Sequence, residues 1–152
     1  MKTSAGILLY RTTQGHLQVM LVHPGGPFWA KKEEGAWTVP KGEVAEGEDV
    51  LATAKREFQE ETGITIDGDF IALAPIKQAG GKVVHAFALE MDVDVSAIKS
   101  NTFPLEWPPK SGRILQVPEV DRAEWFDMPT ARNKINKAQV ELLDELIQLL
   151  PR

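Results

Sequence analysis

Residues 42–64 read GEVAEGEDVLATAKREFQEETGI, and this stretch decides how the rest of the chain is interpreted. Its first part is punctuated by glycine and is expected to form a loop. Residues 48–62 are good helix formers, and Gly63 follows them in the position of a C-terminal cap. The stretch therefore predicts a loop that leads into a helix.

The predicted helix has one acidic face. Because a helix advances about 100° per residue, Glu57, Glu60 and Glu61 lie within an arc of roughly 100°. Three carboxylates in the last turn repel one another and also face the negative end of the helix dipole. Bound cations would relieve both effects, and an oxygen-rich site without thiols suits Mg²⁺ or Mn²⁺. The helix therefore predicts a divalent-metal site.

The same residues resemble the Nudix box, G-x5-E-x7-R-E-U-x-E-E-x-G-U, where U is a bulky aliphatic or aromatic residue, at every specified position. The resemblance to MutT-like Nudix hydrolases implies an α/β fold, a Nudix-type α/β/α sandwich with a mixed β-sheet between helices. It implies a single domain over residues 1–152. It also implies an enzyme in which water cleaves a diphosphate linkage with the help of Mg²⁺ or Mn²⁺.

The resemblance implies roles for individual residues of the box. Glu60 and Glu61 are expected to be metal ligands, and Glu57 either a ligand or the general base, an alternative that stays open. Arg56 is expected to orient the glutamates through paired hydrogen bonds. Glu48 is expected to be a supporting residue at the helix start, where negative charge is favourable.

Residues outside the helix complete the predicted metal site. The resemblance implies a tight loop at Gly42, with the carbonyl of Lys41 or Gly42 reaching the metal. It also implies a further acidic ligand from a loop well beyond the box. Glu119, six residues before Trp125, fits the expected spacing, and Asp121 is the reserve candidate. A surface acid without a ligand role is the alternative for Glu119.

Aromatic and basic residues are the candidates for substrate binding. One group lies in a proline- and glycine-rich loop, where a base could stack on a ring and a lysine could contact phosphate. The alternative is a loop held in place by its aromatic residues. The tryptophan just before the box has two alternative roles, as a substrate platform or as a core residue. The candidates are Trp29, Lys32, Trp37, Lys41, Trp107 and Lys110.

The remaining chain alternates between strand patterns and loops. Four prolines in residues 101–118 indicate an insertion with at most one short strand. An amphipathic helix is expected over about residues 137–150, and mixed strands with a central and a terminal helix predict a sheet between helices. Strand patterns are found at residues 5–10, 17–23, 64–66, 70–76, 82–93, 113–117 and 123–126.

Composition excludes several classes of protein. The chain of 152 residues has the length of one domain, and the absence of cysteine excludes disulfides, thiol nucleophiles and cysteine-based zinc sites. A net charge of −5 argues against a broad surface for a nucleic-acid polymer. Without a signal-peptide layout, or an apolar run of the roughly 20 residues that cross a bilayer, the protein is expected in the cytoplasm and not at a membrane.

The leading functional hypothesis is hydrolysis of a nucleoside diphosphate derivative, either a nucleotide or a dinucleoside polyphosphate. The Trp-x-x-Pro-Lys-Gly-Glu sequence of residues 37–43 resembles members that act on dinucleoside polyphosphates or diphosphoinositol polyphosphates, so the latter substrate is an alternative. A catalytically silent Nudix domain that senses a nucleotide or binds a partner is another. The expected partner is a small nucleotide or polyphosphate, bound by a monomer or a homodimer.

Overall fold

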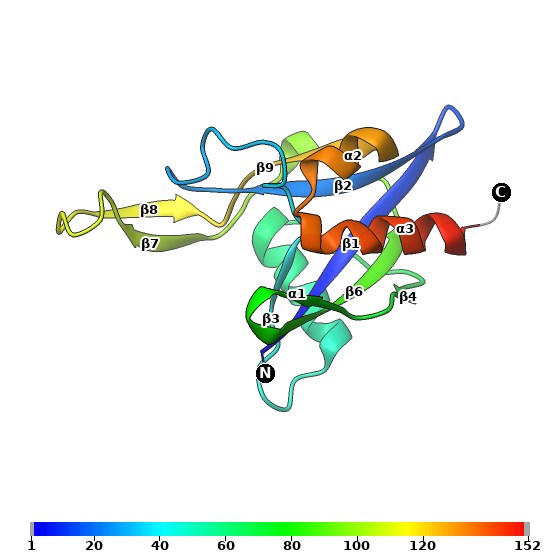
Figure 1. The fold of residues 1–152 in the computed structure, drawn as a ribbon, viewed down its shortest axis with the longest axis horizontal. Coiled ribbons are helices and arrows are strands. Elements are labelled where there is room, and N and C mark those ends of the chain that lie inside the picture. The colour runs from blue at the N-terminus through cyan, green and yellow to red at the C-terminus, as the bar shows by residue number, and fades with distance from the viewer. Residues whose placement is uncertain (1, 151–152) are drawn as a thin grey trace.

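The centre of the sheet is β1 (Thr3–Thr13), shown in blue in Figure 1. The computed structural model describes residues 2–150, apart from the side chain of Ala79. In it β1 pairs in parallel with β6 and in antiparallel fashion with β2 and β3, so the seven-stranded sheet is mixed. The other six strands are β2 (His16–Pro24), β3 (Lys41–Glu43), β4 (Ile71–Ala72), β5 (Ile76–Gln78), β6 (Lys82–Glu90) and β9 (Val120–Asp127).

Both faces of the sheet are covered by helices. Residues 4–10 of β1 are all buried, as expected for a strand with packing on both sides. Ile7 belongs to the apolar cluster beneath α1 (Val50–Thr62), whereas Leu8 belongs to the opposite cluster beneath α3 (Val140–Leu149). These two cores confirm the predicted mixed sheet between helices.

The helix predicted over residues 48–62 ends at Thr62 as expected but begins at Val50, two residues later than predicted. The Asp49 carboxylate accepts a hydrogen bond from the Ala52 N–H at 2.9 Å, and Gly63 has a φ of 75°, which favours glycine. The terminal helix is also present, as the single turn η3 (Lys137–Gln139) followed by α3. Within residues 2–150 every helix is too short or too polar to cross a bilayer.

Some local predictions are wrong. Residues 64–66 form no strand, and residues 70–76 contribute only β4 and the first residue of β5. A further helix, α2 (Met128–Lys134), was not predicted, although Asp127 caps its first turn by accepting from the Thr130 N–H. Its seven residues are too few to show a helical period in the sequence.

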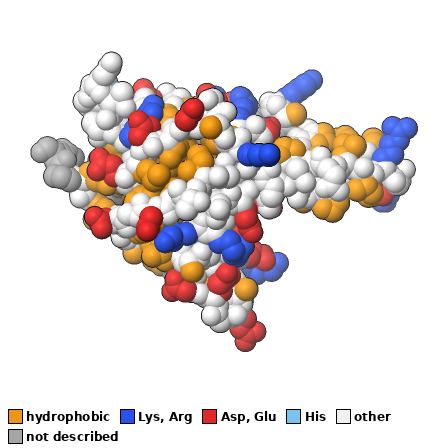
Figure 2. Space-filling model, turned by 180° about the vertical axis from the view of Figure 1, so that it is seen from behind, with side chains coloured by type: hydrophobic (Ala, Val, Ile, Leu, Met, Phe, Trp, Pro, Cys, Tyr) orange, Lys and Arg blue, Asp and Glu red, His pale blue; other side chains and the backbone are white. Residues whose placement is uncertain are grey.

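The insertion forms a projecting hairpin, which we call the arm (Figure 1). It consists of β7 (Thr102–Glu106) and β8 (Ile114–Pro118), so the expectation of at most one strand is wrong. Prolines are tolerated here because both strands are edge strands. At the tip, the Glu106 carboxylate accepts from the Lys110 and Gly112 N–H groups at 3.1 Å each. Hydrophobic side chains are visible on the surface of the arm in Figure 2, which shows the reverse side.

Candidate active site

Three carboxylates meet beside the second half of α1. One oxygen from each of Glu57, Glu61 and Glu119 lies within 4.8 Å of the other two. Glu57 and Glu61 are one helical turn apart, whereas Glu119 comes from the short connection between β8 and β9. Asp121, the reserve candidate, lies outside this cluster and is hydrogen-bonded to His23.

Glu61 is the most deeply buried member of the cluster. Its exposed fraction is 5%, and none of the described residues hydrogen-bonds to its Oε2. Burial, followed by the neighbouring Glu57 and Glu119 carboxylates, raises the pKa of Glu61 to about 9. Burial and the nearby Glu60 also raise the pKa of Glu57. Crowded carboxylates with an unpartnered buried oxygen fit a divalent cation, and an all-oxygen donor set suits Mg²⁺ or Mn²⁺.

These pKa values predict a pH dependence for the metal-free protein. The pKa of Glu61 is about 9 when folded and ordinarily 4.5, so between these values only the folded state holds the proton. The free energy of unfolding should therefore fall as pH rises through this window. The free energy of unfolding of Glu61→Gln should not fall in this way, as denaturant titrations with chelator at several pH values would show. Parallel pH profiles for the two proteins would contradict the expectation.

Arg56 makes the contacts expected of it. Its Nη1 donates to Glu57 Oε2 at 3.2 Å and to both Glu60 carboxylate oxygens at 3.0 and 3.1 Å. Its Nε and Nη2 donate to Glu48 at 3.3 Å each. Glu60 is therefore held by Arg56 and lies outside the group formed by Glu57, Glu61 and Glu119. The ligand role predicted for Glu60 stays a prediction.

Strand β3 places Lys41 and Gly42 against these acids. A Cβ at Gly42 would overlap the Glu57 carboxylate, so the absence of a side chain makes room for that acid. Against the larger effect of burial, the Lys41 side chain and backbone N–H both act to lower the pKa of the Glu61 carboxyl. Burial, together with the adjacent Lys82, lowers the pKa of the Lys41 side chain to about 8. Strand β3 thus lies against two of the candidate residues on α1, Glu57 and Glu61.

Glu119 is positioned by backbone contacts from two distant segments. Its N–H donates to the Asn101 carbonyl at 3.0 Å, and its carbonyl accepts from the Gly25 N–H at 3.1 Å. Asn101 in turn donates its N–H to the Glu60 carbonyl at 2.9 Å, which ties this segment to α1. A Cβ at Gly25 would overlap the Pro118 carbonyl oxygen, so glycine permits this close approach.

The loop of residues 25–35 carries the predicted aromatic and basic pair. Lys32 Nζ lies 3.5 Å from the centroid of the Phe28 ring and 5.4 Å from that of Trp29. The Phe28 and Trp29 rings meet edge to face at 5.0 Å. Phe28 is 55% exposed, so the group presents an open aromatic surface next to a positive charge. Its contact with substrate stays a prediction.

Three other residues predicted to bind substrate occupy different places in the fold. Trp37 has an exposed fraction of 0% and packs edge to face on Phe126, with ring centroids 5.0 Å apart. A ring without an exposed face cannot stack on a ligand, so the substrate role predicted for Trp37 is corrected to a core role. Trp107 and Lys110 lie at the tip of the arm, whereas Glu119 follows its base. The structure does not bring Trp107 and Lys110 to the carboxylates.

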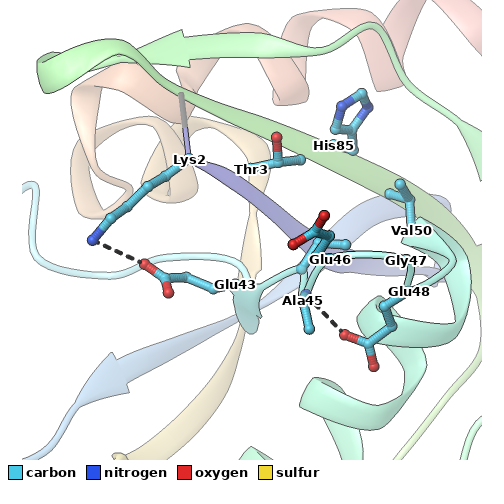
Figure 3. Close-up of a pocket in the computed structure, with 10 residues that line it drawn as sticks. Lys2, Thr3, Glu43, Ala45, Glu46, Gly47, Glu48, Val50 and His85 are labelled. Carbon is cyan, nitrogen blue, oxygen red and sulfur yellow. Dashed lines mark hydrogen bonds and ion pairs between the residues drawn. The ribbon is translucent and has the colours of Figure 1, made fainter.

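A pocket of about 590 Å³ lies at the start of α1 and was not predicted (Figure 3). It is bordered by the loop that follows β3, by the beginning of β1 and by His85 of β6. Lys2 and Glu43 form an ion pair of 3.5 Å at its edge. His85 is thus a residue of the pocket wall. Glu57, Glu61 and Glu119 do not line this pocket.

Sequence reasoning also missed His23. This residue is fully buried, with both ring nitrogens hydrogen-bonded, and one of its partners is Asp121. The only signal in the sequence is a polar residue at the end of an apolar strand, directly before Pro24. That pattern does not distinguish a buried histidine from the first residue of a loop.

A family model and several known proteins match this chain. A family model of the NUDIX domain matches residues 1–146. An octanoyltransferase of Myxococcus xanthus is 32% identical over 101 residues, which are 66% of this chain and 25% of that protein. An RNA pyrophosphohydrolase of Caulobacter vibrioides is 42% identical over 52 residues, 31% of this chain and 30% of that protein. The matched segments thus span less than a third of these curated relatives.

Solved structures with the same fold cover nearly the whole chain. An Ap4A hydrolase of C. elegans in a binary complex has a TM-score of 0.65 at 22% identity, over 97% of this chain and 96% of that one. The NUDIX domain of Shewanella oneidensis NrtR, complexed with ADP ribose, has a TM-score of 0.68 at 17% identity, over 98% and 88%. These likenesses show the fold, and the family model covers the box and its surroundings. The chain belongs to the NUDIX domain family.

Proposed function

We propose that this protein is a metal-dependent hydrolase that cleaves a diphosphate linkage in a nucleoside diphosphate derivative. The observation that carries the proposal is the convergence of Glu57, Glu61 and Glu119 around an unpartnered, buried carboxylate oxygen. Its support includes relatives named as an RNA pyrophosphohydrolase and an Ap4A hydrolase, and a similar domain complexed with ADP ribose. Each of these names refers to a nucleotide or a nucleic acid that contains phosphate.

In this proposal Glu61 and Glu119 hold Mg²⁺ or Mn²⁺, with Glu57 as a third ligand or as the general base. The carbonyl of Lys41 or Gly42 is a further ligand. When bound, such a cation polarises a phosphoryl oxygen and makes its water a better nucleophile at neutral pH. Glu60 is proposed as a ligand as well. The Arg56 guanidinium group donates hydrogen bonds to both Glu60 and Glu57. Arg56 fixes the directions of both side chains.

Glu57 is proposed as a ligand or as the general base. Its carboxylate is partly buried, and its raised pKa favours accepting a proton from water. Gly42 sets the distance of this carboxylate from β3. The remaining requirement of phosphoryl transfer is the positioning and charge neutralisation of the substrate phosphates.

Divalent metal should be required for turnover. Dialysis against chelator should abolish hydrolysis, because neither the acids nor Arg56 can replace a divalent cation in activating water, and added Mg²⁺ or Mn²⁺ should restore it. The measurement is release of phosphate or nucleoside monophosphate from a panel of nucleotides, among them dinucleoside polyphosphates and ADP ribose. Full turnover in rigorously metal-free protein would disprove the mechanism. Binding without any product across the panel would favour a silent, ligand-sensing domain.

The loop of residues 25–35 is proposed to bind part of the substrate. The double change Trp29→Ala with Lys32→Ala should raise KM far more than it lowers kcat, because it removes contacts made equally in the ground and transition states. Base stacking on an aromatic side chain contributes about 1 to 3 kcal/mol, which corresponds to roughly 5- to 150-fold in KM. An unchanged KM in a protein with normal circular dichroism would exclude the loop from recognition.

A further inference from the structure

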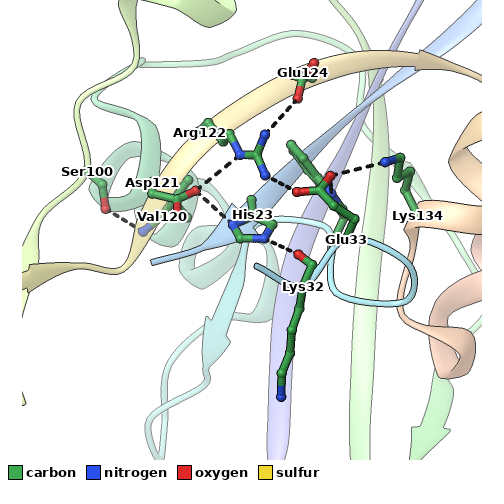
Figure 4. A network of polar contacts seen from close by, with 10 residues as sticks. His23, Lys32, Glu33, Ser100, Val120, Asp121, Arg122, Glu124 and Lys134 are labelled. Carbon is green, nitrogen blue, oxygen red and sulfur yellow. Dashed lines mark hydrogen bonds and ion pairs between the residues drawn. The ribbon is translucent and has the colours of Figure 1, made fainter. Parts of the chain in front are cut away.

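His23 links the loop of residues 25–35 to the segment that carries Glu119 (Figure 4). The ring is completely buried at the end of β2. Its Nε2 donates to the Lys32 carbonyl at 2.6 Å, since a carbonyl oxygen can only accept. Its Nδ1 lies 2.9 Å from Asp121 Oδ1 and is hydrogen-bonded to it. One side chain therefore bridges two segments that carry different proposed functions.

Asp121 reaches His23 because β9 contains a bulge. His23 pairs with Arg122, but the next residue, Pro24, pairs with Val120, so Asp121 is the extra residue. Val120 and Ala123 accordingly belong to the same apolar cluster although an odd number of positions separates them. A bulge redirects side chains at the end of a strand. Here it turns one carboxylate toward His23, two residues after Glu119.

The bulge and Glu119 are tied to the same end of β2. Gly25 donates its N–H to the Glu119 carbonyl, and His23 holds the Asp121 side chain. On the other side, the Val120 N–H donates to the Ser100 hydroxyl at 3.0 Å. The position of the Glu119 backbone thus depends on a few contacts on each side, and the His23–Asp121 hydrogen bond is one of them.

The loop is tied to β9 at a second point as well. Glu33 accepts from Arg122, which neighbours Asp121 in sequence, and from the Lys134 ammonium at 3.1 Å. Arg122 lies over the Trp37 ring, 5.0 Å from its centroid. These groups hold the far part of the loop against the core. Besides the Gly25–Glu119 backbone hydrogen bond, the His23 contacts therefore tie the loop to the segment that carries Glu119.

We propose that His23 is a positioning residue that sets the affinity of the metal site through Asp121 and Glu119, and holds the substrate loop through Lys32. The inference rests on the proposed function in that it takes the carboxylates to be metal ligands. His23 is inaccessible to substrate, so it acts only through its two partners. Hydrogen bonds behind a metal ligand fix its orientation, and their removal weakens metal binding about 10- to 100-fold.

Two substitutions separate the two contacts. The amide nitrogen of glutamine lies close to the place of Nε2, so His23→Gln keeps the contact with Lys32 and loses Asp121. The amide nitrogen of asparagine lies close to that of Nδ1, so His23→Asn keeps Asp121 and loses Lys32. We expect His23→Gln to weaken Mn²⁺ binding by about 10-fold or more in calorimetric titrations. We expect His23→Asn to bind Mn²⁺ normally but to exchange the amide hydrogens of residues 25–35 faster.

Asp121→Ala provides an independent test, because this side chain is partly exposed and its loss leaves no buried cavity. It should weaken Mn²⁺ binding as much as His23→Gln, and the double variant should be no weaker than either single one. The exposed His16 supplies the matched control, with His16→Gln leaving Mn²⁺ affinity and loop exchange unchanged.

The outcomes distinguish this inference from the proposed function. If the unmodified protein binds no Mn²⁺, or if Glu61→Gln binds it equally well, the metal site itself is disproved. If Glu61→Gln abolishes binding while Asp121→Ala binds Mn²⁺ normally, only the role of His23 is overturned. Equal losses of affinity in His23→Gln and His23→Asn would likewise overturn it, since they would show a general packing role.

Discussion

Glu61→Gln should turn over substrate about two to four orders of magnitude more slowly than the unmodified protein, as expected for the loss of a metal ligand or catalytic acid. Glutamine keeps the shape of the side chain but removes the negative charge from the centre of the carboxylate cluster. Glu61 is the most buried of the three acids, so it is more shielded from water than Glu57 or Glu119. The measurement is single-turnover hydrolysis of the best substrate at saturating Mg²⁺.

The fold should survive this change. A buried carboxylate with an unpartnered oxygen destabilises the metal-free protein, so the variant should melt at the same temperature or higher. Glu141→Gln is the matched control, because Glu141 is exposed on α3, which covers the opposite face of the sheet. Near-normal turnover by Glu61→Gln, with Mn²⁺ still bound, would place the active site elsewhere.

Gly42→Ala should reduce turnover by about 100-fold or more while leaving the fold intact. The new methyl group would occupy the place of the Glu57 carboxylate, and the flexible Glu57 side chain would be displaced. A displacement of about 1 Å in a catalytic group can lower the rate about 100-fold. Turnover and Mn²⁺ affinity should both fall, with a melting temperature within a few degrees of that of the unmodified protein.

Gly6→Ala is the contrasting variant. A Cβ at Gly6 would lie 2.6 Å from the Pro40 carbonyl oxygen and 2.7 Å from Lys41 Cβ, where backbone and not a flexible side chain must give way. This change should therefore lower the melting temperature. If Gly42→Ala instead behaves like Gly6→Ala, losing stability and activity together, then the glycine serves strand packing and not the placement of Glu57.

The parts of the fold that the sequence predicted are those specified by local signals. The helix of residues 50–62 has its cap, its apolar face and its terminal glycine within one continuous stretch. The arm was missed because its prolines argue against strands in general, whereas a hairpin of two edge strands accommodates them. The pairing of β1 with β3 was missed because a strand of three residues has no detectable alternation.

In the site, too, local sequence signals predicted some residues, whereas others depend on tertiary structure. Glu57 and Glu61 are fixed by helical geometry, and the spacing to Trp125 was enough to suggest Glu119. The choice between Glu119 and Asp121 depends on a bulge, which depends in turn on how β2 and β9 align in three dimensions. Trp37 shows the opposite problem. An aromatic ring before the box is compatible with a ligand platform or with a core, and only its neighbours decide between them.

The parallel pairing of β1 with β6 has a consequence for how the chain reaches its native state. Thr3 pairs with Val83, so β1 cannot complete its pairing until β6, from the second half of the chain, is available. Contacts between such distant residues slow folding, because the entropy of closing the long intervening loop is lost before the contact is gained. During synthesis, the apolar β1–β2 hairpin leaves the ribosome long before β6 and α3 can cover it. Newly made chains should therefore be prone to aggregation, and slower translation or chaperones should raise the yield of folded protein.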